Sequence, residues 1–501
     1  MRAVAQRPAW ELACAGAIVA AAAWLRLGHL GLMEFKQDEA TGVEIGRAIL
    51  HGHLQATGLV SSVGAKNPPL FVYLVALPLA IWNDPRSAAG FVALTAVVAV
   101  ALTYIILRPR FGALAALTAS ALFATAPWAV LYGRKIWAQD LLPIVTVLLL
   151  WSLFVLLERS RSRLVVFVPI LLSLTVQLNF SALALVVPVL LVVLYRWRHV
   201  NWLALLAGIG VVLVLLSPWL VHDAKHHFSD ITTLAKSGRG EGSPDYIGQG
   251  AVEAVRQTVY IVSAGNWGYV AGSSRILLER DAGWEWTAGR IAGFVTVGGA
   301  VLGILSSLVV IALHTRFRRG WPPVLFDLDA ERRLVLLTWL LGIWLSYVDS
   351  TKDKVLPHYL IAIFPIPFVL AGLGISDVVS RARRRSVRPV RLAAYAAAVA
   401  VAVGFFAFDA GFTRFLETHR GTAGDYSVVY HDKAALAAVA RRDHLGVYDQ
   451  HELQWLATGS FDTPPGMRLV TVLDTLSQSG QLPCTGKLRT FGALEACFPS
   501  G

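Results

Sequence analysis

Long apolar runs separated by short polar turns make up the chain as far as about residue 410. Eleven of them are candidates for membrane-spanning helices, although several fall short of the ~20 residues that a perpendicular span needs. They cover roughly residues 12–30, 86–107, 111–131, 140–157, 163–179, 181–195, 201–220, 290–313, 333–348, 358–376 and 391–409. The pattern predicts an all-α polytopic membrane domain over residues 1–409. Residues 410–501 are more polar and predict a small α/β domain.

One further apolar run, residues 70–82, decides the predicted orientation. If it crossed the membrane, Arg108 and Arg110 would lie outside and the later loops would exchange sides. If it lies in the interface, every dense arginine cluster falls on one side, which the positive-inside rule makes the cytoplasm. We therefore predict a cytoplasmic amino terminus and an interfacial run at 70–82. The predicted outer regions are loops 31–85, 132–140, 221–289 and 349–357 and the C-terminal domain 410–501.

Composition agrees with this pattern and excludes an ordinary soluble enzyme. Of the 501 residues 56% are hydrophobic and only 15% are charged, against ~25% charged in soluble domains. The net charge of +12 comes from arginines in short clusters between apolar runs. Such clusters are typical of an orientation signal, so we expect no nucleic-acid partner.

The C-terminal domain has two of the three cysteines, Cys484 and Cys497, and Cys14 lies in the first apolar run. The two tail cysteines are close in sequence and have no His or Cys cluster beside them for zinc. Because the tail is predicted to face an oxidising compartment, we expect a Cys484–Cys497 disulfide.

Two adjacent carboxylates, Asp38 and Glu39, stand in the first outer loop within MEFKQDEATGVEIGR (33–47). Val43 and Gly46 follow Glu39 at helical spacing, so the pair is expected at the start of a short surface helix. The positive end of the helix dipole favours carboxylates there. A capped surface helix with no further role also fits this pair, so the interpretation depends on other polar stretches of the same side.

Three further polar stretches occur at predicted outer ends of apolar runs: KNPPLFVYLVALPLAIW (66–82), YGRKIWAQD (132–140) and DSTKDKVLPHY (349–359). Their cations, amide, imidazole and phenols are suited to a lipid phosphate. Anchoring of an interfacial segment, snorkelling toward headgroups and a plain interfacial histidine remain open alternatives. The candidate substrate-binding residues are Lys66, Asn67, Tyr73, Arg134, Lys135, Lys352, Lys354, His358 and Tyr359.

On these stretches and on HYLIAIFPIPFVLAGLG (358–374), the sequence resembles the GT-C glycosyltransferases of the protein O-mannosyltransferase and aminoarabinose transferase type. The resemblance implies a GT-C fold and transfer of a sugar from polyprenyl phosphate on the outer face, with inversion at the anomeric carbon. It also implies that Asp38 is the catalytic acid/base with Glu39 beside it and Asp140 a second essential carboxylate. His358 and Tyr359 would bind phosphate.

The chain departs from the family before its two prolines. Relatives of the aminoarabinose type often have Glu-Lys there, where this chain has Lys66-Asn67. The phosphate-binding lysine is therefore displaced by one position. A divalent metal that relies on the missing glutamate is left open, and no other cofactor is expected.

The sequence thus predicts a glycosyltransferase of the plasma (inner) membrane that uses a polyprenyl-phosphate-linked sugar. The acceptor would be an extracytoplasmic glycan, lipid or protein hydroxyl. Membrane lipids would surround the protein itself. Asp38 would take the acceptor proton, while Lys66, Arg134, Lys135 and Lys354 are candidates to stabilise the departing phosphate. A transporter or lipid-linked-sugar flippase is the alternative, but transporters place charges near the midplane and show repeated halves. A scaffold that only displays the tail would not explain why the acids and basic turns share one side.

Overall fold

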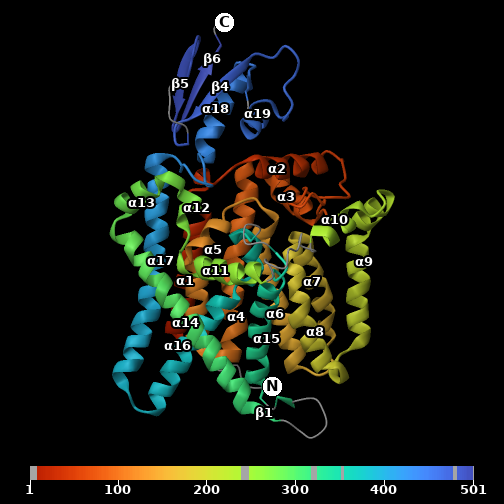
Figure 1. Cartoon of the computed structure of the whole chain (residues 1–501), viewed down its shortest axis with the longest axis vertical. Helices are drawn as coiled ribbons and strands as arrows, with labels where there is room; N and C mark the ends of the chain where they lie inside the picture. Colours follow the sequence, from red (N-terminus) through yellow and green to blue (C-terminus); the bar gives the residue numbers. More distant parts are fainter. Residues whose placement is uncertain are drawn as a thin grey trace.

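Helices form most of the chain before residue 420 in the computed structural model (Figure 1), which describes residues 8–237, 248–316, 324–325, 327–350, 355–448, 450–477 and 482–499. All eleven predicted apolar runs are helical. The long helices and their immediate continuations are α1 Ala9–Leu27, α4 Pro85–Thr125, α5 Pro127–Tyr132, α6 Leu142–Glu158, α7 Phe167–Leu178, α8 Val186–Tyr195, α9 Trp202–Lys225, α14 Trp284–His314, α15 Leu328–Leu345, α16 Ile366–Arg384 and α17 Arg388–His419. The predicted membrane protein with a small α/β domain is confirmed.

Two features explain how these helices relate to the predicted spans. Gly112 interrupts α4 with φ 87°, which only glycine adopts at little cost, so α4 comprises two of the predicted spans. Within the described residues six helices are long and apolar enough to cross a membrane, or seven if the 3₁₀ helix Pro357–Ile363 and α16, bent by 56°, form one span. The helical segments 163–178 and 180–195 are shorter than the bilayer core. The number of eleven spans stays a prediction.

Large apolar side chains on the outside of the bundle suit a lipid environment. Leu203 and Val214 on α9 are 80% and 71% exposed, and Phe294 on α14 is 70% exposed. Apolar exposure on this scale is unfavourable in water and favourable against lipid chains. The chain is therefore an integral membrane protein.

Ion pairs gather at the end of the bundle that lies away from the C-terminal domain. Arg108 pairs with Glu11, and Glu158 pairs with both Arg110 and Arg332. The strands β1 Thr315–Arg316 and β2 Val324–Leu325 lie at the same end, shortly before α15 (Figure 1). These arginines belong to the clusters that were predicted to be cytoplasmic, so the structure places them together on one side.

Several shorter helices lie toward the opposite end, and α2 and α3 lie directly beneath the C-terminal domain (Figure 1). Gly42 and Gly46 let α2 pack closely on α3, because a Cβ at either would lie 3.0 Å from Phe71 or Leu79. The helix α3 has only 12 residues, which fits the expected interfacial segment better than a span. The shorter helices toward this end are α2 Gln37–Leu50, α3 Leu70–Ile81, α10 Ser229–Ser237, α12 Trp267–Ala271 and α13 Arg275–Ala282, while α11 Gln249–Ser263 lies nearer the middle of the bundle (Figure 1).

The last long helix, α17, continues past residue 410, where the C-terminal domain was predicted to begin. Helix α17 continues to His419 because Phe412, Phe415 and Leu416 are buried against the bundle. A four-stranded sheet follows in the order β3-β4-β6-β5, with β3 parallel to β4 and the other pairs antiparallel. Its elements are α18 Tyr430–Arg442, β3 Gly446–Val447, α19 His451–Thr458, β4 Leu469–Asp474, β5 Lys487–Phe491 and β6 Leu494–Phe498.

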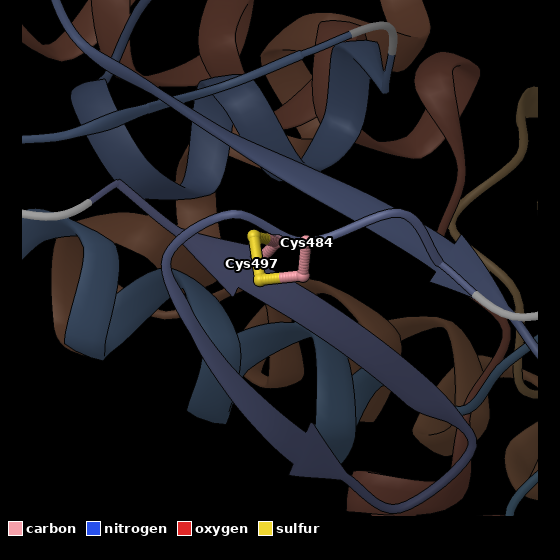
Figure 2. Close-up of a disulfide and its surroundings, with 2 residues drawn as sticks. All are labelled: Cys484 and Cys497. Atoms are coloured by element: carbon pink, nitrogen blue, oxygen red, sulfur yellow. A yellow bond between two sulfur atoms is a disulfide. The ribbon is translucent and has the colours of Figure 1, made fainter.

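Two contacts hold this domain together and hold it on α2. Cys484 and Cys497 form the predicted disulfide, which ties the segment before β5 to β6 (Figure 2). The Phe35 ring lies 5.2 Å from that of Tyr430 and 6.1 Å from that of Trp455. Because these rings are buried, they fix the domain above the stretch that leads into α2.

Candidate active site

The adjacent acids Asp38 and Glu39 begin α2, as predicted, but they face different environments. The backbone N–H of Lys36 donates to Glu39 Oε2 at 3.0 Å and closes the first turn of the helix. Glu39 is fully buried, whereas Asp38 is exposed. Only Asp38 can therefore meet a substrate without movement of the protein.

Lys135 supplies the buried positive charge beside this turn. Its ammonium lies 2.8 Å from Glu34 Oε1 and 3.5 Å from the centre of the Trp137 ring. Lys36 reaches the same Glu34 oxygen at 2.7 Å. Glu34 therefore joins a buried lysine to a partly exposed one.

Buried carboxylates outnumber the buried cations around Lys135. Glu34, Glu39 and Asp140 are each at most 2% exposed, and we call these three acids with Lys135 the acid cluster. Neither oxygen of Asp140 has a hydrogen-bond partner in the described part of the chain, nor has Glu39 Oε1. Unpaired buried acceptors lower the free energy of unfolding. These atoms therefore do not stabilise the fold, which favours a functional role for the cluster.

Electrostatics adjusts proton binding within the acid cluster. Burial raises the pKa of Glu39, and although Lys135 opposes this, the nearby Glu34 adds to it, so that the pKa is about 7. Burial lowers the pKa of Lys135, but Glu34 and Glu39 more than compensate and raise it above its ordinary value. Near neutral pH Lys135 is therefore charged, while the protonated and ionised forms of Glu39 are close in free energy.

Arg134 lies behind the acid cluster and does not face the exterior. It is 8% exposed and donates to the carbonyl of His29 at 2.9 Å. Together with Glu34, Lys135 and Asp409 it lines a small cavity of about 20 Å³. This position favours a role in balancing charge over the predicted direct contact with substrate.

The predicted residues of the stretch 66–82 form hydrogen bonds to the loop before α3 and to Asp230. The backbone N–H of Lys66 donates to Asp230 at 2.8 Å, and Asn67 donates to a backbone carbonyl of its own loop. The Tyr73 hydroxyl bonds both to the N–H and to the carbonyl of Gln55, each at 3.1 Å. These bonds order the loop before α3, and the structure does not bring the three residues into the acid cluster.

His358 and Tyr359 approach the acid cluster through an aromatic contact. The His358 ring packs edge-on against Trp137 at 5.2 Å, the same indole that lies under Lys135, and against Tyr359 at 4.2 Å. The Tyr359 hydroxyl donates to Ser62 at 2.8 Å. The predicted Lys352 and Lys354 lie outside the described residues.

Sequence reasoning missed three residues of this site: Glu34, Lys36 and Asp425. Lys36 Nζ lies 3.0 Å from Asp425 Oδ1, so a residue that follows the last long helix also reaches the site. Glu34 and Lys36 stand beside the acidic pair in the sequence, and their alternation of charge was an available clue. For Asp425 no motif pointed to the contact.

The arrangement does not present an evident metal site. Among the residues that the structure describes, no group of three or more His, Cys, Asp or Glu side chains has the spacing for a metal ion. The carboxylates of the acid cluster are instead arranged around an ammonium group. The question of a divalent metal at the Lys66-Asn67 stretch therefore stays open, and the proposed reaction uses side chains alone.

Comparison with known proteins agrees with this architecture. Residues 66–222 match the family of dolichyl-phosphate-mannose-protein mannosyltransferases, while no curated protein sequence matches the chain. Over 98% of this chain and 99% of the other, the fold is similar to that of ArnT from Cupriavidus metallidurans, solved with bound undecaprenyl phosphate, with a TM-score of 0.55 and 13% identity. The oligosaccharyltransferase of Archaeoglobus fulgidus gives a TM-score of 0.51 at 14% identity, covering 87% of this chain and 58% of that one. These findings confirm the predicted resemblance to GT-C membrane glycosyltransferases of the mannosyltransferase and ArnT type.

Proposed function

We propose that the protein transfers a sugar from a polyprenyl-phosphate donor to a hydroxyl group on the extracytoplasmic side of the plasma (inner) membrane. The observation that carries this proposal is the position of the acid cluster. It includes Glu39, the neighbour of the exposed Asp38, and is linked through Lys36 to Asp425 in a protein whose fold is similar to that of ArnT. An accessible acid that can take the acceptor proton and fixed cations that can stabilise the departing phosphate are groups that this glycosyl transfer uses.

In the proposed reaction, an acceptor oxygen attacks the anomeric carbon and the bond from that carbon to the phosphate oxygen breaks. The electron pair of that bond leaves with the polyprenyl phosphate. Asp38 takes the proton of the acceptor hydroxyl, since it is the exposed member of the acidic pair. Attack from the face opposite the phosphate gives inversion.

Glu39 and Asp140 support this chemistry from behind. Glu39 is fully buried and caps α2 through Lys36 N–H, so it fixes the turn that presents Asp38. Glu34 and Glu39, and to a smaller extent Asp425 and Asp140, raise the pKa of Lys135 and keep it charged. The acids around Lys135 thereby fix the position of the first turn of α2 and the electric field near it.

Cations at the edge of the site would stabilise the departing phosphate. Lys36 is 29% exposed at its side chain, whereas Lys135 is only 3% exposed, which favours Lys36 as the direct contact. His358 and Tyr359 lie on the same side, next to Trp137. The resemblance assigns them to phosphate, and Lys66, Lys352 and Lys354 remain candidates for it.

A transfer assay with purified protein in nanodiscs tests the proposal. A panel of radiolabelled polyprenyl-phosphate sugars is supplied with extracted envelope glycans, lipids and proteins as acceptors. We expect label to move to an acceptor with the wild type and not with Asp38→Asn. Translocation of the labelled lipid across liposomes without any transfer would reject the glycosyltransferase and support the flippase alternative.

A further inference from the structure

The C-terminal domain contributes a short segment, residues 420–433, to the stretch that carries the acids, and we call this segment the strap. The Tyr426 hydroxyl donates to the carbonyl of Leu32, and the N–H of Tyr430 donates to that of Met33 at 3.0 Å. Lys433 Nζ donates to the carbonyl of Phe35 at 2.8 Å. The strap therefore holds the backbone immediately before Lys36.

The other side of the strap is fixed against α12 and the turn after it. The N–H of Asp425 donates to the Tyr269 carbonyl at 3.0 Å, and Thr422 Oγ1 donates to that of Val270 at 2.7 Å. The approach is so close that a Cβ at Gly424 would lie 2.3 Å from Gly272 N. Asp425 is thus placed by a rigid backbone and not by a free loop.

From Asp425, alternating charges run inward to the acid cluster. Its Oδ1 is 3.0 Å from Lys36 Nζ, which is 2.7 Å from Glu34 Oε1, which is 2.8 Å from Lys135 Nζ. Exposure falls along this line, from 31% for Asp425 and 29% for Lys36 to 2% for Glu34. Lys36 is therefore the accessible cation of the series, held between two acids.

We propose that Asp425 is a positioning residue that holds the Lys36 ammonium at the edge of the active site, where it contacts the phosphate of the donor. This rests on the proposed function. Asp425 does not itself contact the donor, and it acts through Lys36. The C-terminal domain would in this way complete a site whose other residues belong to the membrane domain.

A purely structural tie is the competing explanation. Tyr430 and Trp455 already pack on Phe35, and Lys433 bonds to its backbone. An ion pair that is about a third exposed adds little to such docking. If the strap is only a structural tie, substitution of Asp425 lowers folding stability and has no specific effect on Lys36. The following measurements distinguish the two explanations.

The first test is a double-mutant cycle on the binding of undecaprenyl phosphate to the full-length protein in nanodiscs. We expect Lys36→Met to weaken binding roughly tenfold, as for a lost charge-assisted hydrogen bond. Asp425→Asn should weaken it about two- to fivefold. In the Lys36→Met background Asp425→Asn should add nothing, and Asp425→Glu should restore part of the loss. Equal effects of Asp425→Asn in both backgrounds would overturn the proposal.

The matched control is Asp443→Asn, which removes an acid of the same domain that pairs with the neighbouring Arg442. It should leave binding unchanged. Melting temperatures of all variants are measured in parallel. If Asp425→Asn weakens binding only in proportion to lost folded protein, the structural tie is correct.

The second test needs no ligand and follows the reactivity of the Lys36 amine. Burial lowers the pKa of Lys36, but Glu34 and Asp425 raise it above its ordinary value. Labelling with an amine-reactive reagent at pH 9, read by mass spectrometry, should be several times faster in Asp425→Asn, with the exposed Lys487 as internal reference. An unchanged Lys36 rate would reject the positioning role. If wild type fails to bind undecaprenyl phosphate, the proposed function fails, and labelling alone decides whether Asp425 holds Lys36.

Discussion

Two groups of charges at opposite ends of the helical bundle are built differently. Away from the C-terminal domain, Arg110 and Arg332 donate four hydrogen bonds of 2.7–3.1 Å to the two carboxylate oxygens of Glu158. In the acid cluster, Asp140 has no hydrogen-bond partner for either oxygen and Glu39 has none for Oε1. One group satisfies its charges and the other leaves them partly unsatisfied.

The difference indicates which group stabilises the fold and which serves a reaction. Pairing both oxygens of Glu158 offsets the cost of removing the ions from water. An unpaired buried acceptor instead costs about 1–3 kcal/mol, and such costs are typical of functional sites. The comparison predicts that substitutions will affect stability at the Glu158 end and chemistry at the acid cluster.

The largest expected effect is on catalysis. Asp38→Asn keeps the size of the side chain but removes the proton acceptor, so the transfer rate should fall by ~10²–10⁴. Binding of undecaprenyl phosphate and the melting temperature should stay within error of the wild type, because Asp38 is exposed. Transfer rate and lipid affinity in nanodiscs provide the measurement. Near-normal transfer would return the acidic pair to a capped surface helix.

The opposite behaviour is expected of Glu158→Ala. The side chains of Arg110 and Arg332 are only 9% and 13% exposed in the wild type. In the variant both would lose their shared partner. Leaving such charges unpaired should lower the free energy of unfolding by about 3 kcal/mol. Transfer per folded molecule should not change. A normal melting temperature in detergent would show that this ion pair is not structural.

A pH dependence of stability should come from Glu39. Its pKa is 4.5 as an ordinary carboxyl and about 7 in the fold, so ionisation costs more in the folded than in the unfolded state. The free energy of unfolding should therefore fall as the pH rises from about 4.5 to 7 and then level off, by roughly 1–3 kcal/mol. Glu39→Gln should reduce this decline, and Asp140, whose pKa is also raised by burial, contributes the remainder. The check is the melting temperature of both proteins at pH 5 and pH 8, where equal pH responses would contradict the raised pKa.

Much of the fold followed from the sequence because apolar runs and arginine clusters are local features. The disulfide followed too, since Cys484 and Cys497 are near neighbours in the chain. The site was harder. Asp38 was visible as part of a charged motif, but the burial of Glu39 depends on packing against distant helices. Asp425 stands 389 residues from Lys36, and no periodicity of the sequence specifies such a contact.

The smallest and most discriminating effect concerns Asp140. Four carboxylates, those of Glu34, Glu39, Asp425 and Asp140, act on Lys135. Burial raises the pKa of Asp140, and the neighbouring Glu39 and Glu34 add to this. Asp140→Asn removes that unfavourable interaction and should raise the free energy of unfolding by about 1 kcal/mol, a typical gain at a strained functional position. Transfer should fall modestly, because Asp140 contributes to the field around Lys135, although less than Glu34, Glu39 and Asp425. The sign of this change in the free energy of unfolding decides between a functional and a structural role of Asp140. A loss of stability resembling that of Glu158→Ala would show that Asp140 is a structural partner. The two ends of the bundle would then differ in geometry but not in function.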